Sequence, residues 1–132
     1  MSNLDPVINR NLKLIKKSLP LISCICITSN RSTLLQRALA CFERQDYPMR
    51  ELVISYPEDD FLTKRVVEQI EELSTIKMVR IERKTDEKLG QARNNAISAA
   101  NGEFICICYY SLTGDWGYAP YFIPNPDIYN QS

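Results

Sequence analysis

The sequence predicts an α/β fold, a three-layer α/β/α sandwich with a mostly parallel sheet. Short apolar runs alternate with amphipathic helical patterns along the chain, and this alternation is typical of a parallel sheet with right-handed crossovers. The 132 residues are 45% hydrophobic and 24% charged, which is the composition and size of one globular domain.

The chain is expected to have three parts. Residues 1–19 form a leader with apolar residues at roughly helical spacing, either a short amphipathic helix on the domain or a frayed arm. Residues 20–110 form the α/β domain. Residues 111–132 are rich in Gly, Pro and aromatic residues, and we expect an irregular tail that wraps the domain or lacks its partner elements.

The strands are predicted where short apolar runs are bounded by turn residues, at 21–27, 51–55, 76–81 and 103–109. The first run is apolar at nearly every position, as in a strand that is buried on both faces. The polar turn that follows it contains Asn30 and Ser32, and either residue is expected to cap the next helix.

Three helices are predicted between these strands. The first carries apolar side chains from Leu35 to Phe42 on one face, and Tyr47-Pro48 is expected to end it. The others are predicted at 61–73 and 89–100. Asn101-Gly102 follows the last helix as a typical C-cap pair.

Charge and composition exclude several classes of function. Lys plus Arg equals Asp plus Glu, at 16 each, which argues against a nucleic-acid partner. His is absent, so the chain cannot build a Ser-His-Asp or Cys-His site. No apolar run reaches the roughly 18 residues of a transmembrane segment, and the N-terminal residues do not have the basic start and apolar block of a signal peptide. We expect a cytoplasmic location, and the alternative is a location at the periphery of a membrane.

Ligands of open parallel sheets bind beyond the carboxyl ends of the strands. This rule nominates the loops at 28–32, 55–60, 82–91 and 109–116. The common phosphate and nucleophile signatures, GxxxxGK[ST], GxGxxG and GxSxG, are missing from them.

The most informative loop leads into the third helix. Gly90 at the helix start allows a ligand to approach the backbone, where free N–H groups favour an anion. Arg93, one turn later, can place its planar fork on a phosphate. The alternatives are that Gly90 only admits close helix–sheet packing and that Arg93 pairs with Glu87 or Asp86.

Several motifs occur here in the order seen in a known family. They are Cys24-Ile-Cys-Ile-Thr-Ser-Asn-Arg31, Leu35-x-Arg-Ala-Leu39, Gln45-Asp-Tyr-Pro48 before Glu51-Leu-Val-Ile54, Leu89-Gly-x-Ala-Arg-Asn94 and Ala100-Asn-Gly-Glu-Phe-Ile105. Over residues 20–108 the chain resembles the family 2 glycosyltransferases of the GT-A fold.

The resemblance implies a domain that binds a nucleotide-diphospho-sugar donor on a sheet ordered 3-2-1-4. The family reaction is inverting transfer of the sugar to a saccharide or lipid-linked acceptor, with Mg²⁺ or Mn²⁺. The alternative function is a non-catalytic nucleotide-binding or interaction module. In that case the aromatic residues of the tail can form a homodimer or partner surface, although packing onto the sheet is favoured. These residues are Trp116, Tyr118, Tyr121 and Phe122.

Carried over residue by residue, the resemblance implies two groups of donor contacts. The polar turn after the first strand faces the nucleobase and ribose, and the start of the third helix faces the diphosphate-sugar. The base-binding Asp of the family falls on Tyr56, and the acidic residues after it are candidate substitutes. The donor-binding candidates are Thr28, Ser29, Asn30, Arg31, Glu58, Asp59, Gly90, Arg93 and Asn94, with Asp60 as a further substitute for the missing Asp.

The fourth strand departs from the family pattern. The family ends this strand with an Asp-x-Asp motif that holds the metal ion, whereas this chain has Tyr109-Tyr110-Ser111. The nearest carboxylate is Asp115, either a weak metal ligand or a turn residue beside Gly114. The family's catalytic base lies in a later half, and no residue here is assigned that role. We therefore expect a partial donor site with little or no turnover by this chain alone.

Four cysteines form the last constellation. Cys24 and Cys26 lie two apart on the first strand, and Cys106 and Cys108 lie two apart on the fourth. Each pair therefore points to one face of the sheet, and the implied order makes the strands neighbours. Core packing is favoured over a metal site, because a flat strand pair spaces thiolates poorly for a tetrahedron.

Overall fold

The computed structural model describes residues 19–110, 116–118 and 123–129. The elements are β1 (Ile22–Ile27), α2 (Ser32–Glu43), β2 (Arg50–Pro57), α3 (Phe61–Leu73), β3 (Lys77–Arg83), α4 (Leu89–Ala99), β4 (Phe104–Tyr110), β5 (Trp116–Tyr118), β6 (Ile123–Pro124) and α5 (Pro126–Tyr129). The predicted alternation of strands and helices is confirmed. The expectations for the leader before residue 19 and for Asp115, Tyr121 and Phe122 lie outside the described residues.

The sheet has the order β3-β2-β1-β4, and its three successive pairings are parallel. The expected order 3-2-1-4 is therefore confirmed. β5 and β6 both pair antiparallel with β4. The tail expected to be irregular thus contains regular elements where it is described. Strands of three and two residues are too short to show a pattern in a sequence, because their pairing with β4 defines them.

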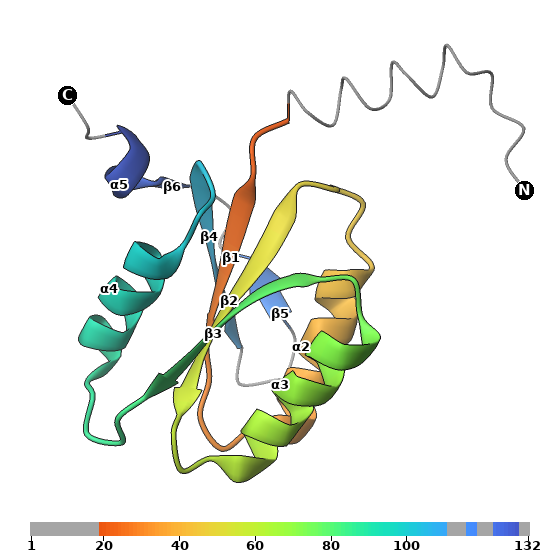
Figure 1. Cartoon of the computed structure of the whole chain (residues 1–132), viewed down its shortest axis with the longest axis vertical. Helices are drawn as coiled ribbons and strands as arrows, with labels where there is room; N and C mark the ends of the chain where they lie inside the picture. Colours follow the sequence, from red (N-terminus) through yellow and green to blue (C-terminus); the bar gives the residue numbers. More distant parts are fainter. Residues whose placement is uncertain (1–18, 111–115, 119–122, 130–132) are drawn as a thin grey trace, which may run out of the picture.

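Helices cover both faces of the sheet: α2 and α3 lie on one side and α4 lies on the other (Figure 1). Alternate residues of each strand enter separate cores. On β1, Cys24 and Cys26 pack in the core under α2 and α3, whereas Ile25 packs under α4. No helix among the described residues has the length and apolar composition that a bilayer crossing needs.

Cys24 and Cys26 lie on one face of the sheet, as predicted, and Cys106 lies on the same face. Cys24 pairs in register with Cys106, and Cys26 pairs with Cys108. The side chains of Cys24, Cys26 and Cys106 are buried within the apolar core under α2 and α3. This placement agrees with the favoured interpretation, in which they act as small hydrophobic side chains.

The amino end of the sheet holds a buried polar network around Glu51, whose side chain is fully buried. Its Oε1 accepts hydrogen bonds from Ser23 Oγ and from the Asn101 backbone N–H, both at 2.6 Å. The Gly102 N–H donates to Ser23 Oγ at 2.8 Å. Asn125, also fully buried, donates from Nδ2 to the Gly102 carbonyl at 2.8 Å. The network joins β1, β2 and the turn before β4 to the segment between β6 and α5.

The structure corrects the expected role of Asn101-Gly102. The C-cap of α4 is Ala100, which is extended. A Cβ on Gly102 would lie 2.5 Å from Ser23 Oγ and 2.7 Å from the Leu21 carbonyl. Glycine is needed here because the turn approaches β1 closely, and not because it ends a helix.

Candidate functional site

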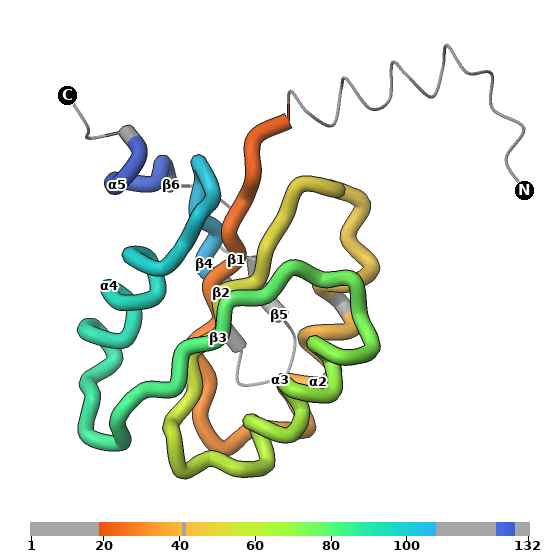
Figure 2. Tube along the Cα trace, viewed as in Figure 1, coloured from red at the N-terminus to blue at the C-terminus, as the bar shows by residue number. Residues whose placement is uncertain are grey.

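A pocket of about 250 Å³ opens at the carboxyl end of the sheet. At this end the chain turns from β1 into α2 and from β3 into α4 (Figure 2). The pocket therefore lies where the rule for parallel sheets places a ligand. Its lining residues are Ile27, Thr28, Ser29, Arg31, Arg83 and Leu89. Three of the predicted donor residues, Thr28, Ser29 and Arg31, are brought together here.

Thr28 is the deepest polar residue of this pocket. Its side chain is only 3% exposed, and its Oγ1 has no hydrogen-bond partner within the described part of the chain. The backbone of Thr28 is held on both sides, because its N–H donates to the Ser55 carbonyl and its own carbonyl accepts from Arg83. A buried hydroxyl without a partner is uncommon in folded proteins and calls for an explanation.

Asn30 has a structural role that the sequence did not suggest. Its φ of 52° lies in the left-handed region, which Asn adopts more readily than most residues. Its backbone N–H donates to Asp60 Oδ2 at 2.6 Å. The expected cap at Asn30 or Ser32 is wrong: the N-cap residue of α2 is Arg31, and its side chain makes no capping hydrogen bond.

Asp60 stabilises the loops at the carboxyl end of the sheet. It is the N-cap of α3, accepting from the Thr63 N–H at 3.2 Å and from Thr63 Oγ1 at 2.6 Å. Burial alone would raise the pKa of Asp60, but hydrogen bonds from Thr63 and Asn30 outweigh burial and lower it. Its carboxylate is therefore charged and committed to holding two loops together.

Arg83 is a pocket residue that the sequence analysis did not single out. The prediction ended the third strand at residue 81, whereas β3 continues to Arg83, which pairs with Pro57 of β2. Its guanidinium donates from Nη2 to the Thr28 carbonyl at 2.8 Å and from Nη1 to Ser55 Oγ at 3.1 Å. Burial lowers the pKa of Arg83, and the nearby Glu87 and Asp60 oppose that effect.

The predicted diphosphate residues lie at the start of α4, beside the pocket residue Leu89. Gly90, Arg93 and Asn94 are exposed and do not line the pocket itself. A Cβ on Gly90 would meet no atom within 4 Å, so the alternative of close helix–sheet packing is wrong. No ion pair joins Arg93 to Glu87 or Asp86 in the described residues. Glu87 instead accepts from Asn95 Nδ2.

Replacing Gly90 by alanine is therefore expected to raise the free energy of unfolding by about 0.4–1 kcal/mol, because alanine restricts the unfolded chain and favours the helix. Urea denaturation of the variant and the wild type measures this change. A loss of more than about 1 kcal/mol would mean that the position needs glycine for packing or backbone conformation.

The acidic loop after β2 does not contribute to the lining of the pocket. Tyr56, at the position of the family's Asp, is fully buried in the core under α2 and α3. Glu58 and Asp59 are exposed and absent from the lining. Their role in donor binding stays a prediction.

The described residues do not fit a divalent metal ion. No group of three or more His, Cys, Asp or Glu side chains that could hold an ion occurs among them. β4 ends at Tyr109 and Tyr110, which provide no carboxylate. Because Mg²⁺ and Mn²⁺ require oxygen ligands, usually carboxylates, no step of a reaction is assigned to a metal here.

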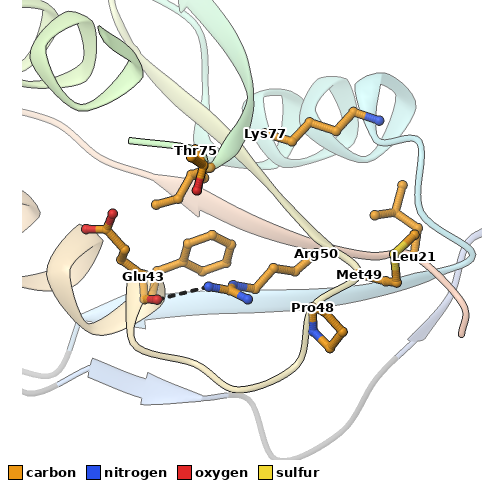
Figure 3. A pocket seen from close by; sticks show the side chains of 9 residues that line it. Leu21, Glu43, Pro48, Met49, Arg50, Thr75 and Lys77 are labelled. Atoms are coloured by element: carbon orange, nitrogen blue, oxygen red, sulfur yellow. Dashed lines mark hydrogen bonds between the residues drawn. The ribbon is translucent and has the colours of Figure 1, made fainter. Parts of the chain in front are cut away.

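A second pocket, of about 350 Å³, lies at the opposite end of the sheet (Figure 3). Arg50 lines this pocket. Its guanidinium lies 5.2 Å from the centre of the Phe42 ring and donates from Nη2 to the Glu43 carbonyl at 3.0 Å. α2 ends at Glu43, before the expected stop at Tyr47-Pro48, and Arg50 donates to the carbonyl of this last helical residue. Arg50 Nε has no partner among the described atoms, but the group as a whole holds the helix end.

Comparisons with known proteins agree with the fold. Residues 23–108 match the model of the family described as Glycosyl transferase family 2. The chain is similar to the mannosyltransferase PcManGT from Pyrobaculum calidifontis, solved with GDP-Man and Mn²⁺, with a TM-score of 0.61 and 20% identity over 80% of this chain. It is also similar to S. aureus TarS 1-349, with a TM-score of 0.55 and 26% identity over 66% of this chain.

The chain spans 36% of the length of the first structure and 26% of the second. It is therefore partial relative to both. No curated protein sequence matches the chain.

Proposed function

Because the chain belongs to glycosyl transferase family 2, we propose that it binds a nucleotide-diphospho-sugar at the carboxyl end of the sheet. The reaction served by this site is inverting transfer of the sugar to a saccharide or lipid-linked acceptor. The observation that carries the proposal is the buried hydroxyl of Thr28 in the pocket at that end, which has no hydrogen-bond partner among the described residues. A polar group of the nucleoside would satisfy it.

The start of α4 supports a place for the diphosphate. Free N–H groups at a helix N-terminus favour an anion, and Arg93 and Asn94 project from the first turns of the same helix. Arg93 is exposed and makes no ion pair with a described residue, so its guanidinium is available to a phosphate. The open space at Gly90 leaves room for that group.

The first test is thermal unfolding of the chain with the diphosphates of uridine, guanosine, thymidine and cytidine, each with Mn²⁺ and with chelator. A diphosphate present at a hundred times its dissociation constant should stabilise the fold by about 2.7 kcal/mol. If no nucleotide raises the melting temperature, the donor site is refuted.

The second candidate function is a nucleotide-binding module without catalysis. The observation that favours it is the end of β4, where tyrosines stand in place of a carboxylate pair. This candidate predicts that a nucleoside diphosphate binds equally well with Mn²⁺ and with chelator. A catalytic domain predicts that affinity rises with the ion, and that nucleotide release depends on an acceptor.

Thr28→Val separates ligand binding from folding. Valine keeps the shape and removes a hydroxyl that has no partner, so the free energy of unfolding should stay the same or rise. Affinity for the preferred nucleoside diphosphate should fall by about 1 kcal/mol, roughly five-fold, as measured by calorimetry.

The matched control is Thr63→Val. Its hydroxyl donates to Asp60 Oδ2, so this variant should lose about 1 kcal/mol of stability or more. If Thr28→Val loses as much stability as Thr63→Val and its affinity for the nucleotide is unchanged, Thr28 stabilises the fold and does not bind the ligand.

A further inference from the structure

The pocket at the carboxyl end contains a guanidinium that is held in place before any ligand arrives. Arg83 donates to the Thr28 carbonyl beyond β1 and to Ser55 Oγ on β2, at 2.8 and 3.1 Å. Its own carbonyl accepts from the Glu58 N–H at 2.8 Å. Both the backbone and the planar head of Arg83 are therefore fixed, while the guanidinium still has N–H donors that these bonds do not use.

The charged side chains that line the pocket are cationic, although two carboxylates, those of Glu87 and Asp60, act on this guanidinium from nearby. The lining of the pocket includes Arg31 and Arg83 and no carboxylate. Both acids have hydrogen-bond donors of their own: Glu87 accepts from Asn95 Nδ2, and Asp60 accepts from Asn30 and Thr63. The pocket therefore presents fixed N–H donors and a hydroxyl, and a matching ligand group must present acceptors.

Nucleobases differ in how their acceptors are arranged. Guanine places O6 beside N7, and a guanidinium binds this pair through two parallel hydrogen bonds. Cytosine likewise places O2 beside N3. Adenine has an amino group beside N7, and uracil and thymine have an N–H between their two carbonyls, so these bases place a donor where a guanidinium requires a second acceptor.

We infer that Arg83 reads the base, and that the site selects guanosine or cytidine diphosphates over those of uridine, thymidine and adenosine. This inference rests on the proposed function, because it names the donor class of the same site. Arg83 acts as the specificity-determining residue, with the Thr28 hydroxyl as a second contact to the base.

The experiment measures dissociation constants of the full chain for the diphosphates of guanosine, cytidine, uridine, thymidine and adenosine. At least one of the first two should bind about ten-fold more tightly than each of the other three, which is the discrimination expected of a bidentate pair. If guanosine diphosphate is preferred, its 7-deaza analogue, which lacks N7, should lose about ten-fold. If cytidine diphosphate is preferred, its 3-deaza analogue should do so.

Two variants test the residue itself. Arg83→Lys keeps the charge and loses the planar fork, so the five diphosphates should bind within about three-fold of one another. Lys84→Gln removes a neighbouring exposed charge that does not line the pocket, and the base preference should persist. Thermal unfolding without ligand shows whether Arg83→Lys is folded, and the deaza analogues test the inference on the wild type if it is not.

The outcomes separate this inference from the proposed function. If none of the diphosphates binds, the donor site itself is wrong. If they bind with similar affinity, or if uridine diphosphate binds best, the donor site stands and the reading by Arg83 is overturned. A preference that survives Arg83→Lys, or that the deaza analogue does not reduce, also overturns it.

Discussion

Glu51→Ala is expected to lower the free energy of unfolding by about 3 kcal/mol or more. The variant leaves the Ser23 hydroxyl and the Asn101 backbone N–H without the acceptor that both now share at 2.6 Å. Ser23 is buried, and a buried donor left unsatisfied costs about 1–3 kcal/mol, whereas the Asn101 N–H is only partly buried and should add less. Lys77 Nζ is 3.9 Å from Oε2 but its side chain is 61% exposed, so its loss should add little.

Chemical denaturation of the wild type, Glu51→Ala and Glu51→Gln measures this effect. Glutamine keeps one oxygen acceptor, so Glu51→Gln should lower the free energy of unfolding by less than Glu51→Ala does. The control is Glu71→Ala, which removes an exposed ion pair with Arg80 and should change stability by less than about 1 kcal/mol. If Glu51→Ala changes the free energy of unfolding by as little as Glu71→Ala does, the network does not stabilise the fold.

Gly102→Ala should be the second most damaging change, at about 3 kcal/mol, which is the upper part of the usual range for overpacking. The new methyl group would lie 2.5 Å from Ser23 Oγ and 2.7 Å from two backbone atoms, the Leu21 carbonyl oxygen and the Ser23 nitrogen. The strand β1 must shift to relieve these contacts, because backbone atoms cannot rotate away as a side chain can.

Gly90→Ala is the natural comparison for Gly102→Ala, since it makes the same change where no atom lies within 4 Å. Denaturation curves of the two variants should move in opposite directions from the wild type. Equal stability of the two variants would show that the turn before β4 adjusts and that glycine is not needed there.

The sequence predicted the layers of this fold well, because each rests on local periodicity. The run from Leu21 to Ile27 and the helix at 61–73 carry clear patterns, and both elements form close to the expected bounds. The strand order followed from the family resemblance and not from the patterns themselves. Polar positions that depend on distant partners were harder to predict.

Glu51 illustrates why. At the start of a strand an acidic residue resembles an exposed position. Its burial becomes favourable only through hydrogen bonds from distant residues, Ser23 and Asn101, which lie 28 and 50 residues away in the sequence. Arg83 was missed for a similar reason, since it ends an edge strand whose residues alternate between half-buried and exposed. Its partners Thr28 and Ser55 come from two other segments of the chain.

Asn125 lies in a stretch whose glycines, prolines and aromatics indicate no regular structure. Its burial depends on the carbonyls of Ala100 and Gly102, which no local pattern contains. A pocket lies at the edge of the sheet where the rule for parallel strands predicts a ligand, and three of the predicted donor residues, Thr28, Ser29 and Arg31, line it. Whether these residues bind a donor stays a prediction.

The buried carboxylate network and the unpartnered hydroxyl occupy opposite ends of the same sheet. A substitution of Thr28, whose hydroxyl makes no hydrogen bond within the described residues, should therefore leave the folding equilibrium nearly untouched. Changes at Thr28 can therefore accumulate without compensating mutations in the network around Glu51.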